Sequence, residues 1–246
     1  MMGFKFIRWQ SVIPSFVAAY MAHFICLQWN IEHSIYIVRL TPNLSFQNTL
    51  WSLLAGIFFG IAALLFSLSN KFFESIFHKI NYRPLRPFIG GTIIVLIIFL
   101  LGTSKYIGLG LPSIQGAFET PAGNYDFIIK LLLTSFTLSA GFKGGEVTPL
   151  FFIGATLGSI IMVYIPLPFA LLAAMGLVGV FAGATHCIIT SIILGIELFG
   201  LKAGVYIGIA SIAAYFSSGP NSIYSSKFKI GAKFALYNYF NKMSKL

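Results

Sequence analysis

Apolar residues run along this chain in long blocks that short polar stretches separate. We place apolar segments at about 11–29, 50–69, 88–102, 124–140, 149–165, 168–185, 187–200 and 203–217. A hydrocarbon core of roughly 30 Å needs about 20 apolar residues per straight span, so the chain has material for about six to eight segments. Residues 108–118 are too short and too rich in glycine to span. The pattern predicts an all-α, polytopic membrane protein.

Composition and charge agree with that prediction. Hydrophobic residues make up 57% and charged residues 9% of the chain, whereas a soluble domain has about a quarter charged residues. The net charge is +10, but the basic residues cluster at 71–86 and 227–245, where they flank apolar segments as in membrane proteins. The sequence contains no stripe of basic residues interleaved with aromatic ones, so nucleic-acid binding is not expected. Charge alone leaves the topology open.

Enzyme chemistry and bound cofactors are not expected. No nucleophile, base and orienting group occur together at recognisable spacing. Cys26 and Cys187 both fall in apolar stretches, which predicts two buried thiols and neither a disulfide nor a metal site.

The stretch at 141–158, GFKGGEVTPLFFIGATLG, carries the most chemical information. Gly144 and Gly145 let the backbone approach a ligand closely or take a positive φ. Thr148 and Pro149 predict a helix start, with the threonine as N-cap and the proline at the first helical position. The unpaired N–H groups of such a start favour a small anion. The alternative is an ordinary loop-to-helix junction at the membrane surface.

Glu146 adds an ionisable group to this helix start. A carboxylate within an apolar stretch is a functional candidate, because its burial costs several kcal/mol unless it is paired or protonated. Pairing with Lys143 is the structural alternative. A carboxyl group near a bound anion should have a raised pKa and could carry a proton. Proton movement would then be coupled to anion movement.

This stretch resembles the Gly-x-Phe-x-Pro motif of the CLC family and the Gly-Ala-x-x-Gly helix that follows it. The residues in register are Gly145, Pro149, Gly154, Ala155 and Gly158, while Val147 replaces the family's phenylalanine. The Glu-Val-Thr-Pro version resembles the fluoride-exporting branch. Residues 181–200 resemble the family's paired helices that end in an acidic residue, here Glu197. Residues 221–227 resemble the start of its last helix, where a tyrosine hydroxyl, here Tyr224, reaches the central anion.

The resemblance implies a division of the chain. Residues 1–82 would be the end of the first repeat, with two membrane helices, and 83–217 the second inverted repeat with the anion-binding turn. Residues 218–246 would be the final helix and a basic tail. Neither Gly-x-Gly-x-Pro nor Gly-Lys/Arg-Glu-Gly, which the first half of the family supplies, occurs before Gly141. We therefore expect a fragment or truncated product.

The resemblance also implies a site and a function. The anion would be bound by Gly145, Glu146, Val147, Thr148 and Tyr224, and Glu146 would couple proton movement. The implied activity is fluoride/proton antiport by a homodimer in the lipid bilayer of the cell (inner) membrane, with a halide anion and protons as partners. A chloride channel or chloride/proton exchanger is the first alternative. A non-transporting membrane fragment is the second.

Other residues are expected to have structural roles. The pairs Gly154 with Gly158 and Gly179 with Gly183 predict small faces for close helix packing. We expect His186 to be a hydrogen-bonded structural histidine. Glu119 and Asp126 should lie at a solvated boundary, and Glu197 should pair with Lys202 across a turn.

Overall fold

The structure is a computed structural model that describes residues 9–30, 36–224 and 233. Residues 36–223 form one compact unit, and residues 1–35 with 224–246 form a second. The second unit contains α1 (Trp9–Gln28). All regular elements among the described residues are helical, which confirms the predicted fold class. The repeat division at 82/83 and 217/218 stays a prediction, because compactness does not test it.

The helices of the larger unit follow the predicted apolar segments closely. They are α2 (Phe46–His78), α3 (Leu85–Leu101), α4 (Leu111–Gly116), α5 (Asp126–Ser139), α6 (Val147–Ile160) with the 3-10 turn η1 (Ile161–Val163), α7 (Phe169–Thr185) and α8 (Ile188–Ser217). The short α4 occupies the stretch that was predicted not to span. Gly200 has non-helical φ/ψ of 79° and 169° inside α8, which matches the predicted break between 187–200 and 203–217.

Helix α2 is longer than its predicted apolar segment at both ends. It starts early because the Ser45 side chain caps it, accepting a hydrogen bond from the Asn48 N–H at 3.2 Å. It continues to His78 because no glycine or proline interrupts residues 71–78. Helices α2 and α8 are each long and apolar enough to cross a membrane. Helices α1, α3, α6 with η1, and α7 contain shorter apolar stretches.

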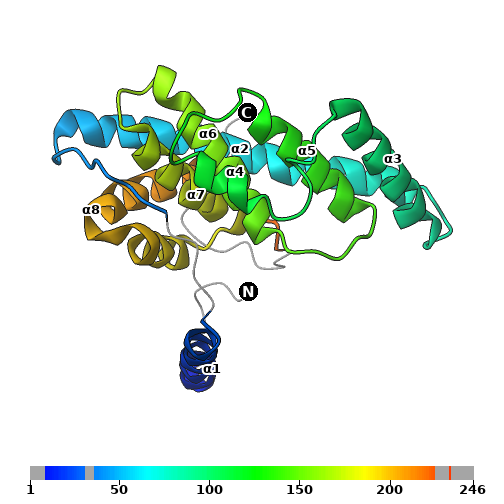
Figure 1. Cartoon of the computed structure of the whole chain (residues 1–246), viewed down its shortest axis with the longest axis horizontal. Helices are drawn as coiled ribbons and strands as arrows, with labels where there is room; N and C mark the ends of the chain where they lie inside the picture. The colour runs from blue at the N-terminus through cyan, green and yellow to red at the C-terminus, as the bar shows by residue number, and fades with distance from the viewer. Residues whose placement is uncertain (1–8, 31–35, 225–232, 234–246) are drawn as a thin grey trace, which may run out of the picture. The chain divides into compact units, whose positions relative to one another are not determined.

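Helix α7 forms the centre of the larger unit, and every residue from 170 to 185 is buried. It contacts α6, α8 and α2 (Figure 1). A Cβ added at Gly154 would lie 2.1 Å from the Gly176 oxygen, and one at Gly158 would lie 2.2 Å from the Leu172 oxygen. The backbones of α6 and α7 therefore touch, because neither glycine carries a side chain.

The second predicted small face of α7 packs against α2. A Cβ at Gly179 would be 3.0 Å from Phe59, and one at Gly183 would be 2.9 Å from Ala63, both on α2. Both predicted packing faces are thus confirmed. Within residues 36–224, Glu197 and Lys202 form no ion pair, so that prediction is wrong. Both side chains are exposed beside the break at Gly200, where solvation competes with pairing.

Both cysteines are partly exposed rather than buried, so the prediction of two buried thiols is wrong. Cys187 is the N-cap of α8, in the short connection between α7 and α8. Cys26 lies on α1, whose described side chains are mostly exposed. Apolar neighbours in the sequence were therefore not sufficient to predict that either thiol is buried.

Candidate functional site

The helix start that follows Gly145 differs from the predicted one by two residues. Glu146, not Thr148, is the N-cap of α6, and its side chain makes no capping hydrogen bond. Pro149 is the third helical residue, and the Leu150 N–H donates to the Glu146 oxygen at 3.2 Å. The helix begins before the proline because N–H groups in a first turn have no intrahelical acceptor, so the missing proline N–H costs nothing there.

This start leaves backbone donors next to the acidic side chain. The N–H groups of Val147 and Thr148 belong to the first turn of α6 and have no intrahelical acceptor. The helix dipole places about half a positive charge at the same end. Glu146, Val147 and Thr148 are half-buried and Pro149 is buried. The site therefore combines N–H donors with a carboxyl group in partly buried surroundings.

The two glycines before Glu146 do not take a positive φ, which was one of the two predicted uses of these glycines. Neither Gly144 nor Gly145 has a positive φ, whereas Gly141 does, at 99°. Both residues are exposed, and an added Cβ would meet no atom within 4 Å. In this chain neither packing nor backbone strain requires glycine at 144 or 145, because open space lies beside both. Close approach of a ligand remains their predicted role.

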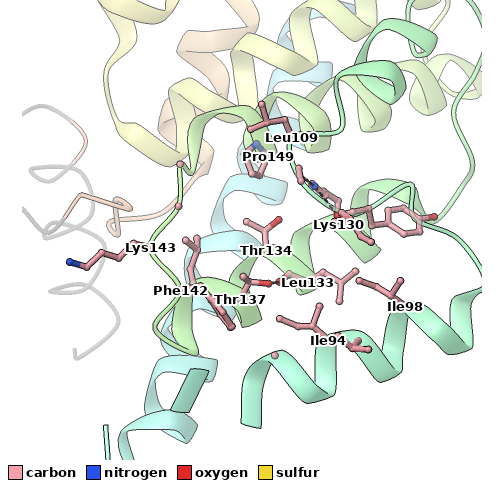
Figure 2. Close-up of a pocket in the computed structure, with 18 residues that line it drawn as sticks. Ile94, Ile98, Leu109, Lys130, Leu133, Thr134, Thr137, Phe142, Lys143 and Pro149 are labelled. Atoms are coloured by element: carbon pink, nitrogen blue, oxygen red, sulfur yellow. Dashed lines mark hydrogen bonds between the residues drawn. The ribbon is translucent and has the colours of Figure 1, made fainter. Parts of the chain in front are cut away.

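Lys143 does not neutralise Glu146 in the part of the chain that the structure describes. The two residues form no ion pair, and Figure 2 shows the Lys143 side chain pointing away from the neighbouring cavity. The structural alternative for Glu146, a local pair with this lysine, is therefore not realised.

A cavity of about 440 Å³ opens beside the stretch 142–145 (Figure 2). Its walls come from α3, from the connection between α3 and α4, from α5, and from the residues that lead into α6. Most lining side chains are apolar, including Ile94, Ile98 and Leu133. The polar ones include Lys130, Thr134 and Thr137. An apolar cavity with a few polar groups is the usual form of a small-ligand site.

Lys130 is a polar residue of this cavity that the sequence reasoning missed. It is only 2% exposed, and its ammonium donates to the backbone oxygens of Tyr106 at 2.9 Å and Gly108 at 2.6 Å. Its Nζ also lies 5.3 Å from the centroid of the Phe152 ring, within reach of a cation–π attraction. A lone lysine inside the apolar stretch 127–133 was the available signal.

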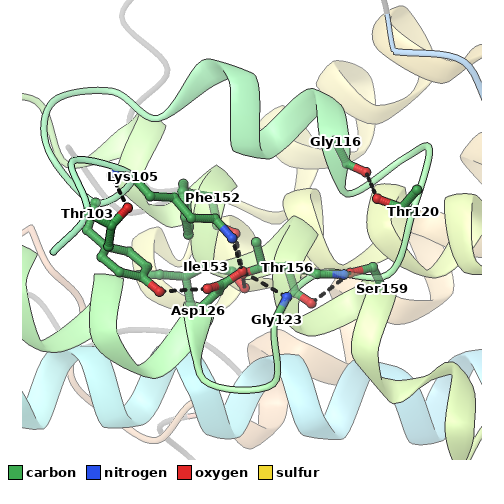
Figure 3. A network of polar contacts seen from close by, with 12 residues as sticks. Thr103, Lys105, Gly116, Thr120, Gly123, Asp126, Phe152, Ile153, Thr156 and Ser159 are labelled. Carbon is green, nitrogen blue, oxygen red and sulfur yellow. Dashed lines mark hydrogen bonds and ion pairs between the residues drawn. The ribbon is translucent and has the colours of Figure 1, made fainter. Parts of the chain in front are cut away.

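Asp126 lies at the start of α5 and is 4% exposed, so the predicted solvated boundary is wrong for this residue. Its carboxylate pairs with Lys105 and accepts hydrogen bonds from the Tyr106 hydroxyl at 2.7 Å and the Gly123 N–H at 2.9 Å (Figure 3). These partners compensate the cost of burying the charge. Burial and the neighbouring carboxylate raise the pKa of Tyr106 to about 12, so its hydroxyl remains a donor at neutral pH.

Asp126 and Lys130 lie one turn apart on α5 and hold the same connecting segment. The Asp126 carboxylate binds the side chains of Lys105 and Tyr106 in this segment. The Lys130 ammonium binds the backbone oxygens of Tyr106 and Gly108. That segment contributes residues 106–109 to the cavity wall. The two charged residues of α5 therefore shape the cavity beside the start of α6.

The remaining predicted residues fall into two groups. Tyr224 belongs to the other compact unit, so its contact with the anion-binding turn stays a prediction. His186 ends α7 with a φ of 61°, its ring lies edge-on to Tyr215 with centroids 5.4 Å apart, and its Nε2 is 3.5 Å from the Ser218 hydroxyl. These contacts agree with the structural role expected for this histidine.

Comparisons with known proteins agree with these features. The sequence profile of a family described as voltage gated chloride channel matches residues 1–219. A chloride/fluoride channel protein of Pseudomonas syringae pv. tomato is 39% identical over 227 residues, which is 89% of this chain and 50% of that protein. The crystal structure of a CLC-type fluoride/proton antiporter superposes with a TM-score of 0.83 at 33% identity, covering 88% of this chain and 55% of the other.

The chain thus spans about half the length of both relatives. The profile covers nearly all of the sequence, and the structural match shows that its helices have the CLC fold. The chain belongs to the CLC family of voltage-gated chloride channels, whose members are integral membrane proteins.

Proposed function

We propose that this chain forms the second half of a CLC-type transporter that exchanges fluoride for protons across the cell (inner) membrane, as a homodimer. The observation that carries the proposal is the position of Glu146, a half-buried carboxyl group that directly precedes the free N–H groups of α6. The names of the two relatives, a chloride/fluoride channel protein and a fluoride/proton antiporter, support the same class of activity.

The geometry suggests how proton and anion could be coupled. An anion at the start of α6 would accept hydrogen bonds from the Glu146 and Val147 N–H groups, with the Tyr224 hydroxyl as a further donor. An ionised Glu146 would repel that anion, whereas a protonated Glu146 would be neutral and could donate a hydrogen bond itself. Binding of the anion therefore favours protonation of the Glu146 carboxyl group, and protonation of that group favours binding of the anion.

Fluoride is favoured over chloride by the residue types at this turn. A small, strongly hydrated anion needs short, strong hydrogen bonds to replace its water. Protonated Glu146 and the Thr148 hydroxyl supply donors at positions where an apolar side chain would supply none. Chloride transport, by a channel or an exchanger, is the alternative, and the name of the Pseudomonas relative mentions both ions.

The test measures ion release from liposomes that contain the purified chain. Vesicles loaded with potassium fluoride are diluted into fluoride-free buffer, and fluoride and pH electrodes record release and proton uptake together. The proposal predicts fluoride release above protein-free vesicles, with coupled proton uptake that Glu146→Gln abolishes. Glu119→Gln is the matched control, because Glu119 is exposed and lies outside the cavity.

Each other outcome points to a different reading. Unchanged proton uptake in Glu146→Gln would remove this residue from the mechanism. Faster release from chloride-loaded than from fluoride-loaded vesicles would favour the chloride alternative. Release of neither ion above the protein-free background would identify the chain, taken alone, as non-transporting.

A further inference from the structure

Helix α2 is longer than a membrane core is thick. Its 33 residues extend over about 50 Å at 1.5 Å per residue, whereas a hydrocarbon core of about 30 Å needs about 20 residues. Residues 50–70 carry no charge, and the first charged residue beyond them is Lys71. The whole of α2 up to residue 70 is uncharged and long enough to cross the core, so we expect the last two turns of α2 to lie in the layer of lipid headgroups.

The sequence becomes apolar again soon after the end of α2. Helix α3 begins at Leu85, and the sequence from 87 to 104 again lacks charged residues. Residues 71–86, here called the basic turn, therefore comprise the end of α2, the connection and the first residues of α3. The basic turn contains four lysines and arginines but one acidic residue, Glu74. Its net charge is strongly positive at the place where headgroups are expected.

The basic side chains are largely available for a partner. Lys71, Lys79 and Arg83 are exposed, and none forms an ion pair with another described residue. The acidic Glu74 contacts its own helix instead, with Oε1 at 3.6 Å from His78 Nε2. Arg86 is less available for a partner than the other three, because its Nε donates a hydrogen bond to the Ile80 oxygen at 3.0 Å.

Large aromatic side chains accompany these charges. Phe72 is 61%, Tyr82 is 68% and Phe88 is 72% exposed. Aromatic rings gather at the boundary between lipid tails and water, whereas an exposed group of this kind would be costly in water alone. Anionic lipids attract basic segments close to a membrane helix, at about 1 kcal/mol for each lysine or arginine. The charges and the rings thus match the two parts of one phospholipid.

We propose that the basic turn is a binding surface for anionic phospholipid, with Lys79 and Arg83 contacting the headgroup phosphate and the neighbouring aromatic rings contacting the acyl chains. This surface is independent of the ion that the chain transports. It would tie the α2–α3 connection to one leaflet of the bilayer.

The test is a lipid titration of the full chain, purified in neutral detergent and followed by native mass spectrometry. Phosphatidylglycerol and phosphatidylcholine with identical acyl chains are compared on the wild type, on Lys79→Gln/Arg83→Gln, and on Arg39→Gln/Lys202→Gln. The second variant is the matched control, because Arg39 and Lys202 are exposed, lie outside the basic turn and also form no ion pair with described residues. Gel filtration verifies that each variant is folded.

The proposal predicts that phosphatidylglycerol binds the wild type more tightly than phosphatidylcholine. It also predicts that Lys79→Gln/Arg83→Gln weakens phosphatidylglycerol binding about 25-fold, or about fivefold for each charge removed, while the control variant binds like the wild type. Equal binding of the two lipids, or an equal loss in both variants, would overturn it. Displacement of the lipid by millimolar glycerol phosphate would also overturn it, because the site would then recognise free phosphate.

Discussion

The contact between α6 and α7 can be tested by adding a single methyl group. In Gly154→Ala, the new Cβ would lie 2.1 Å from the Gly176 oxygen and 2.8 Å from the Leu177 Cα, whereas ordinary contacts begin at 3.4 Å. Both of these are backbone atoms, so no side-chain rotation relieves the clash. The two helices must separate by about 1 Å in a close-packed interior, and overpacking of this kind costs typically 1–3 kcal/mol. We expect a loss of about 3 kcal/mol, at the upper end of that range.

The assay is thermal unfolding of the detergent-solubilised chain, followed by intrinsic fluorescence. For a unit of this size, 1 kcal/mol corresponds to a change in Tm of about 2–4 °C, so Gly154→Ala should lower Tm by about 6–12 °C. Gly116→Ala is the control, since an added Cβ there meets no atom within 4 Å. It should leave Tm unchanged or raise it slightly, because alanine favours helix. A Gly154→Ala protein that melts with the wild type would show that the two backbones do not touch.

Two further predictions concern the charged residues of α5. Asp126→Asn keeps the shape of the side chain but leaves Lys105 without its anionic partner. We expect the free energy of unfolding to fall by about 2 kcal/mol and amide hydrogen exchange over residues 103–110 to become faster. The control variant Glu119→Gln should behave like the wild type in both measurements. Exchange as slow as in the wild type would contradict this. Lys130→Met removes two charge-assisted hydrogen bonds and leaves two carbonyl groups unpaired, so it should destabilise the chain by about 2 kcal/mol and speed amide hydrogen exchange in the same segment. An unchanged or raised Tm would contradict this, because the cost of burying the lysine charge would then exceed the energy of the two hydrogen bonds.

The apolar pattern by itself determined the helices and several of their contacts. The helices lie where apolar blocks were long, and the break at Gly200 separates the two blocks at 187–200 and 203–217. The spacing of Gly154 and Gly158 predicted a close helix contact. These features are local, because a block of apolar residues must form a helix in lipid whatever its neighbours do.

Only the tertiary structure decided where the charged side chains went. Asp126 is buried because Lys105 and Tyr106, about twenty residues earlier in the chain, come to lie beside it. Lys130 bonds to the backbone of the same segment, which is equally distant in sequence. The energy of a buried charge depends on partners brought together by folding, and spacing along the chain does not reveal which partners those will be.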